Sequence, residues 1–141
     1  MTNAIFSDKL CSLSLLVLVS ALCGCSRQSF STAEVTGKVT LDGAPVAGVS
    51  LEFEPGRVGK EILPTGYGST DAEGAYRVTR VGNKPGAVVG KNLVRVTTYE
   101  GSVSKIHPHY STDEGAFQFE VKEGQNVFNV ELVKNPLQKK K

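Results

Sequence analysis

The 141-residue chain has no tryptophan, and its three cysteines, Cys11, Cys23 and Cys25, all lie near the N-terminus. A domain that follows Cys25 therefore contains no cysteine pair that could form a disulfide, so its core alone must stabilise it. The formal net charge of +2 is too small to indicate nucleic-acid binding. The one basic cluster, Lys139 to Lys141, predicts a solvated tail, with contact to an anionic lipid or polymer as the alternative.

Long segments free of glycine and proline are also missing after Cys25. The longest such segment, Cys25 to Thr36, consists mostly of the polar stretch 26–33. An interior glycine costs a helix about 1 kcal/mol and a proline about 3 kcal/mol, so no helix of ordinary length is expected there.

One apolar run, Leu10 to Leu22, is long enough for the hydrophobic part of a signal peptide and too short for a stable membrane-spanning anchor. The last residue of this run, Leu22, begins the sequence Leu-Cys-Gly-Cys (residues 22–25), which resembles the lipobox of bacterial lipoproteins. In that family the chain is cut before the cysteine, whose thiol receives a diacylglycerol and whose new amino group is usually acylated, for example with palmitate. The alternative is an ordinary cleaved signal peptide with a cysteine there by chance.

The lipobox resemblance implies a signal peptide over 1–24 and a lipidated Cys25 that holds the protein on a membrane of the cell envelope. Two or three acyl chains, at about 0.8 kcal/mol per buried methylene, hold a small domain far better than one chain. Ser26 after the cysteine resembles lipoproteins sent to an outer membrane. We therefore expect an outer-membrane or periplasmic location rather than a cytoplasmic one, with residues 25–33 as a tether.

After the tether, short segments alternate apolar and polar residues with period two. Three clear examples place apolar residues at Val49, Leu51 and Phe53, at Phe117, Phe119 and Val121, and at Phe128, Val130 and Leu132. Six or seven half-buried strands of this kind predict an all-β fold, an antiparallel sandwich over residues 34–134, followed by the basic tail 135–141.

Three turns are predicted between these strands. Asp42-Gly43 is typical of a tight hairpin, and the segment from Asp71 to Gly74 predicts a turn with Gly74 at positive φ. The segment from Glu123 to Asn126 also predicts a hairpin.

Three motifs in order resemble the carboxypeptidase regulatory-like domain, in the version found in small bacterial lipoproteins. They are a G-x-V opening with a turn and x-P-hydrophobic-x-G (37–51), an S-T-D-x-x-G-x-Y signature (69–78) and a P-G-x-x-x-G-K signature (85–91). The resemblance covers about Val35 to Val133. It implies a seven-stranded, transthyretin-like Greek-key sandwich and no catalytic residue.

The residues themselves also offer little catalytic chemistry. No serine lies in a G-x-S-x-G elbow, and the glycine-rich segment 56–68 lacks the Lys-Ser/Thr of a phosphate-binding loop. His107 and His109 could join Asp113 or Glu114 at a metal, but solvent-facing loop histidines are the favoured interpretation. We therefore expect that the protein is not an enzyme and that it binds neither a metal nor a cofactor.

Aromatic residues near loops and strand ends mark the possible ligand surface: Tyr67, Tyr99 and Tyr110, together with His107 and His109. Tyrosines at such places also often bury their rings and hydrogen-bond their hydroxyls, so core packing is the alternative. The sequence thus predicts a non-enzymatic, lipid-anchored envelope module with a structural or protein-interaction role. The second hypothesis is a module that binds a glycan or another small ligand.

Overall fold

The structure, a computed structural model, describes residues 30–57, 59–98 and 106–139. The predicted signal peptide, Cys25 and Tyr99 lie outside the described residues. No helix in the described ranges has the length and apolar character needed to cross a membrane.

The described chain forms short strands and two 3-10 helices. The strands are β1 (Thr32–Leu41), β2 (Ala44–Pro45), β3 (Val49–Pro55), β4 (Gly66–Ser69), β5 (Ala75–Arg77), β6 (Thr79–Arg80), β7 (Lys84–Pro85), β8 (Ala87–Val88), β9 (Gly90–Thr98), β10 (Phe117–Val121), β11 (Gln125–Val127) and β12 (Val130–Leu132). The helices are η1 (Pro108–Ser111) and η2 (Pro136–Lys139).

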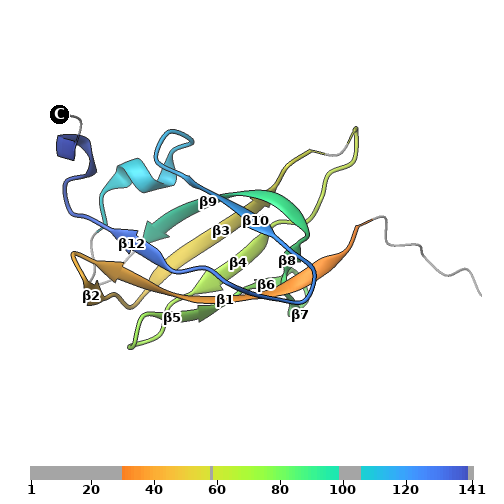
Figure 1. The fold of residues 1–141 in the computed structure, drawn as a ribbon, viewed down its shortest axis with the longest axis horizontal. Coiled ribbons are helices and arrows are strands. Elements are labelled where there is room, and N and C mark those ends of the chain that lie inside the picture. Colours follow the sequence, from red (N-terminus) through yellow and green to blue (C-terminus); the bar gives the residue numbers. More distant parts are fainter. Residues whose placement is uncertain (1–29, 58, 99–105, 140–141) are drawn as a thin grey trace, which may run out of the picture.

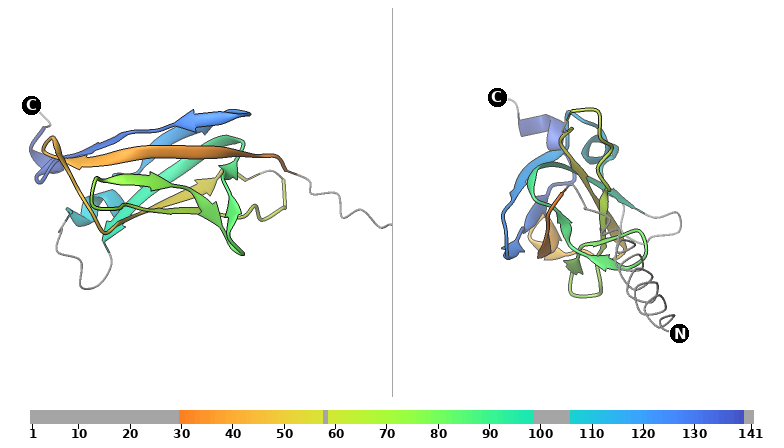
Figure 2. Two further views of the ribbon diagram at one scale, coloured as in Figure 1. Left: turned by 90° about the horizontal axis from the view of Figure 1, so that it is seen from below. Right: turned by 90° about the vertical axis from the view of Figure 1, so that its right-hand side faces the viewer.

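Two sheets pack face to face, which confirms the predicted all-β sandwich (Figures 1 and 2). In the first sheet β1 pairs with β2, β5, β8, β11 and β12, and the second has the order β10-β9-β3-β4-β6-β7. Several short pieces continue one another: β5 leads into β6 through Val78, and β11 leads into β12 through residues 128–129. When these pieces are joined, seven longer strands remain beside β2, β7 and β8, close to the predicted number.

One pairing departs from the predicted antiparallel arrangement. β1 runs parallel to β11 and β12, with Val35 opposite Asn126 and Val39 opposite Val130. The other strand pairs in the two sheets are antiparallel. The first and last long strands of the described chain thus lie side by side and point the same way.

The alternating segments bury most of the residues that their spacing predicts, with Phe117, Phe119 and Phe128 partly buried against the core. Val49, Leu51 and Phe53 of β3 are fully buried against the other core residues. Phe119 and Phe128, from different sheets, stack with 4.4 Å between ring centroids and close one side of the core. Full burial of one such side chain contributes about 1.5–3 kcal/mol, so these residues supply the main stabilisation of the domain.

The structure confirms the Asp42-Gly43 turn and corrects the one at Glu123 to Asn126. Asp42 and Gly43 have φ values of 51° and 85° and join β1 to its antiparallel partner β2. In contrast, β10 and β11 belong to different sheets, so Gly124 lies in a crossover and not in a hairpin. The Asn126 side chain supports this crossover by accepting the Lys122 N–H at 2.9 Å and donating to the Lys122 carbonyl at 2.8 Å. The Asn126 side chain therefore satisfies the backbone N–H and carbonyl of Lys122 within the crossover.

Candidate functional site

The turn between β4 and β5 shapes one end of the candidate site. The Asp71 carboxylate accepts the N–H groups of Glu73 at 3.0 Å and Ala75 at 2.8 Å. Gly74 has φ 70°, as predicted, and a Cβ there would lie 2.6 Å from the Val39 carbonyl oxygen. The turn is therefore closed by one side chain and permits only glycine at the point where it approaches β1.

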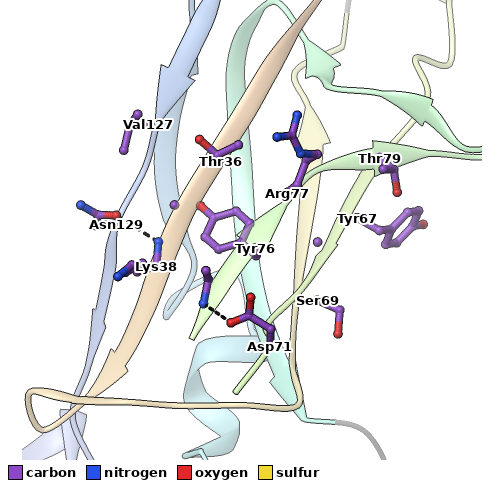
Figure 3. A pocket seen from close by; sticks show the side chains of 13 residues that line it. Thr36, Lys38, Tyr67, Ser69, Asp71, Tyr76, Arg77, Thr79, Val127 and Asn129 are labelled. Atoms are coloured by element: carbon purple, nitrogen blue, oxygen red, sulfur yellow. Dashed lines mark hydrogen bonds between the residues drawn. The ribbon is translucent and has the colours of Figure 1, made fainter. Parts of the chain in front are cut away.

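A shallow groove of about 950 Å³ begins beside this turn and crosses both sheets (Figure 3). Its lining comes from β1, β4, β5, β6, β11 and the residue that precedes β12. The lining residues are Thr36, Gly37, Lys38, Tyr67, Gly68, Ser69, Asp71, Ala75, Tyr76, Arg77, Thr79, Val127 and Asn129.

The two sides of the groove differ in character. On one side Tyr67 leaves 45% of its surface exposed, next to Thr79 in the strand register. On the other side Asn129 accepts the backbone N–H of Lys38 at 3.0 Å, and Val127 is exposed. Figure 3 shows Tyr76 and Arg77 between these two sides. The groove therefore offers one aromatic face and several hydrogen-bonding groups.

Charges of both signs lie along the groove. Arg77 forms an ion pair with Glu34 at the surface, the Lys38 side chain is exposed, and Asp71 is held in its turn. The lining includes the hydroxyls of Thr36, Ser69 and Thr79 but no histidine or cysteine that could act as base or nucleophile. Such a set of groups can bind a polar ligand.

Tyr76 forms the floor of the groove, and contacts with Phe53 and Phe128 hold its side chain in place. Its hydroxyl donates to the Phe128 carbonyl oxygen at 2.6 Å, and its ring lies 6.3 Å from that of Phe53. Burial raises the pKa of the Tyr76 hydroxyl, so this group stays neutral and keeps its proton for the Phe128 carbonyl.

Among the residues predicted for a ligand surface, Tyr67 lines the groove and Tyr110 does not. Tyr110 is 6% exposed, and its hydroxyl accepts the Val133 N–H at 3.0 Å and lies 3.3 Å from the Val133 carbonyl oxygen. Its ring stacks on Phe117 with 5.8 Å between centroids. The prediction for Tyr110 is therefore wrong, because the ring helps close the core and the hydroxyl ties η1 to the chain after β12.

His107 and His109 also lie away from the groove, at η1. His107 Nδ1 accepts the backbone N–H of His109 at 3.1 Å and so caps this helix. Asp113 does not join the histidines: its carboxylate binds the Arg95 guanidinium at 2.6 Å, and the Glu54 carboxylate binds the same guanidinium at 2.5 Å. Within the described ranges no group of three or more possible metal ligands occurs.

The Arg95 cluster was not anticipated from the sequence. Its members come from β9, β3 and the loop before β10, so no local spacing links them. Hydrogen bonds to Asp113, and then to Glu54, raise the pKa of the Arg95 guanidinium, which remains charged throughout the accessible pH range. We interpret this cluster as a clamp between strands and loop, since both carboxylates are already engaged.

Comparison with known proteins adds little to this description. No protein-family model matches the chain, and no curated protein matches it. A solved structure of a DUF3823 family protein from Parabacteroides merdae aligns with a TM-score of 0.44 and 18% sequence identity. The alignment covers 73% of this chain and 46% of that one, so the chain spans less than half of that structure. A likeness of this degree carries no argument about function.

Proposed function

We propose that this protein is a non-enzymatic, lipid-anchored module of the cell envelope, with a structural or protein-interaction role. The observation that carries the proposal is the sequence Leu-Cys-Gly-Cys at 22–25, followed almost directly by a closed sandwich. β1 begins at Thr32, seven residues after Cys25, so the tether spans at most about 25 Å. A lipid on Cys25 would therefore keep the domain close to the membrane surface.

The turn geometry supports a carboxypeptidase regulatory-like domain as the class of this sandwich. Asp42 and Gly43 of the first motif form a tight hairpin, and Asp71 and Gly74 of the second form a closed turn. The motif residues thus have structural roles, as expected for a domain that serves as a scaffold. The lining of the groove combines the half-exposed Tyr67 ring with several hydrogen-bonding side chains, which supports a binding or scaffold role.

Cell fractionation of cysteine variants tests the anchor. Cys25→Ala should release the domain from membranes, whereas the matched variant Cys23→Ala leaves the lipidated residue in place and should remain membrane-bound. Globomycin, which blocks removal of lipoprotein signal peptides, should cause a larger precursor to accumulate. If the Cys25→Ala protein still sediments with membranes in high salt, the anchor is not at Cys25.

Density-gradient separation of the two membranes tests the expected location. Ser26 favours an outer membrane, so the protein should co-sediment with outer-membrane markers. Enrichment in inner-membrane fractions would contradict this location and leave the anchor itself unaffected.

A second candidate function is the binding of a glycan or another small polar ligand in the groove. The specific observation is Tyr67, whose ring is half-exposed beside a row of polar side chains, an arrangement suited to stacking on a sugar. A glycan array with the mature protein tests it, with Tyr67→Ala as the variant that should lose binding and Tyr67→Phe as the variant that should keep most of it. If the protein binds no glycan on the array, glycan binding is ruled out as the function of the groove.

A further inference from the structure

The tether enters the sandwich at one end, and three connections lie at that same end. Thr32 at the start of β1 is opposite Val88, Pro55 at the end of β3 is opposite Asn92, and Val121 at the end of β10 is opposite Gly90. The β3–β4 loop, the β6–β7 turn and the β10–β11 crossover therefore surround the start of β1. Figure 1 shows all of them toward the right-hand end, and the left view of Figure 2 shows the same grouping. We call this end of the domain the tether end.

Two apolar side chains project from separate connections of the tether end. Ile62, in the β3–β4 loop, is 99% exposed, and Val81, in the β6–β7 turn, is 84% exposed. Neither belongs to the core cluster or to the partly buried residues packed against it. Ile62 and Val81 thus place two exposed aliphatic side chains on separate connections of the same end of the domain.

Basic side chains flank these two tips. Arg57 and Lys60 precede Ile62, Lys84 follows Val81, and Lys122 lies in the crossover; all four are exposed. The acidic residues of the same connections are Glu61 and Glu123, so the described side chains at these tips are basic on balance.

The two turns at the opposite end differ in charge from the tips of the tether end. Its two turns carry Asp42, Asp71 and Glu73, and Lys134 lies 3.6 Å from Asp42. The helix η2, with which the predicted basic tail begins, also lies at the left in Figure 1, away from the tether end. The tail is therefore not a neighbour of the apolar tips.

The length of the tether limits how far the tether end can lie from a lipid on Cys25. Phe30, the first described residue, is five residues after Cys25, so the two lie at most about 18 Å apart. If a lipid on Cys25 is inserted in a bilayer, the tether end lies within that distance of the head groups. The tips with exposed apolar side chains and basic neighbours are then close enough to reach the lipid surface.

We propose that the tether end is a second membrane contact, in which Ile62 and Val81 enter the interfacial region and Arg57, Lys60, Lys84 and Lys122 bind anionic head groups. This inference rests on the lipid anchor of the proposed function. An anionic, partly apolar surface matches both the charge and the exposed aliphatic side chains of the tether end. With this end on the membrane, the acidic turns at the opposite end point away from it.

Site-specific probes on the full lipidated protein test the contact. Lipidation occupies the Cys25 thiol, so a single added cysteine can be labelled with an environment-sensitive fluorophore once Cys11 and Cys23 have left with the signal peptide. Ile62→Cys places the probe at the tether end, and Glu73→Cys places a matched probe on an exposed turn at the opposite end. Vesicles contain phosphatidylethanolamine with or without phosphatidylglycerol, plus lipids brominated near the head group as quenchers.

In phosphatidylglycerol vesicles the probe at position 62 should shift to shorter emission wavelength and be quenched by the brominated lipid. The probe at position 73 should show neither effect. Combined Arg57→Ser, Lys60→Ser and Lys84→Ser substitutions should weaken the quenching at position 62, whereas serine at Lys139, Lys140 and Lys141 should leave it unchanged. Equal quenching with and without phosphatidylglycerol would overturn the role of the basic residues.

Vesicle flotation separates failure of this inference from failure of the proposed function. Protein that does not float with vesicles lacks the anchor, and the proposed function then fails. Protein that floats while the probe at position 62 remains as aqueous as that at position 73 overturns the membrane contact alone. Shielding of position 62 only after membrane proteins are added would assign the tether end to a protein partner and would also overturn it.

Discussion

The Tyr76 hydroxyl donates a hydrogen bond to the Phe128 carbonyl oxygen across 2.6 Å, and this contact joins β5 to the break between β11 and β12. Gly37 of β1 lies between them: a Cβ on this residue would collide with the Phe128 carbonyl and lie 3.0 Å from the Tyr76 ring. The glycine of the first motif and the tyrosine of the second therefore meet at one point. This contact forms the floor of the groove and links three strands of the first sheet.

Replacement of Tyr76 by phenylalanine should lower the free energy of unfolding by about 1 kcal/mol, because the ring stays in the core while the hydrogen bond to Phe128 is lost. For a domain of this size, thermal unfolding should then shift down by several degrees. Tyr67→Phe is the control, since no hydrogen bond of the Tyr67 hydroxyl supports the core, and it should melt with the wild type. Identical melting of Tyr76→Phe and wild type would mean that the contact contributes nothing to stability.

Alkaline pH should destabilise the protein through Tyr76. Burial raises the pKa of its hydroxyl above the ordinary value of 10.0, so the unfolded chain releases this proton at a lower pH than the folded protein does. The stabilisation is therefore fully present below about pH 10 and is lost as the pH rises further. Unfolding free energies from urea titrations between pH 8 and 11 should fall less steeply for Tyr76→Phe. Equal slopes for the two proteins would contradict this assignment.

Gly74→Val should destabilise the domain strongly, because the new Cβ would meet the Val39 carbonyl at 2.6 Å and the residue would have to keep φ 70°. The positive φ alone costs a residue with a Cβ roughly 1 kcal/mol or more. Differential scanning calorimetry should show a midpoint several degrees lower. Glu73→Gln, one residue earlier on the exposed face of the same turn, should change the midpoint very little. A Gly74→Val protein as stable as the wild type would show that the turn is placed wrongly.

Asp71→Ala should cost about 1–2 kcal/mol, because it removes the acceptor for the Glu73 and Ala75 N–H groups. Asp71→Asn keeps an acceptor oxygen in the same place and should recover most of the loss. Chemical denaturation of the three proteins gives the comparison. If alanine and asparagine are equally destabilising, the negative charge rather than the hydrogen bonds holds the turn.

Local patterns were sufficient to predict the strands and two of the turns. Alternation placed Leu51 and Phe53 in the core because a strand with one buried face repeats every two residues. Asp42-Gly43 and Asp71 to Gly74 were predictable because their backbone conformations depend on a few adjacent residues.

Features that join distant parts of the chain were not predictable. Gly124 resembles a hairpin glycine, but whether its flanking strands pair depends on which sheet accepts each of them. Tyr110 lies in a polar loop segment, and its burial depends on Phe117 and Val133. The groove brings Tyr67 and Asn129 together from different sheets, and no spacing in the sequence links these two residues.

The most direct test of the proposed anchor is mass spectrometry of the N-terminal peptide of the protein isolated from its native membranes. Trypsin should release Cys25-Ser26-Arg27 as the N-terminal peptide, since Arg27 is the first basic residue after the lipobox. The proposed function predicts that this peptide carries a diacylglyceryl group on the Cys25 sulfur, with or without an acyl group on its amino group. An N-terminal peptide with a free Cys25 thiol, or a chain that retains residues 1–24, would contradict it.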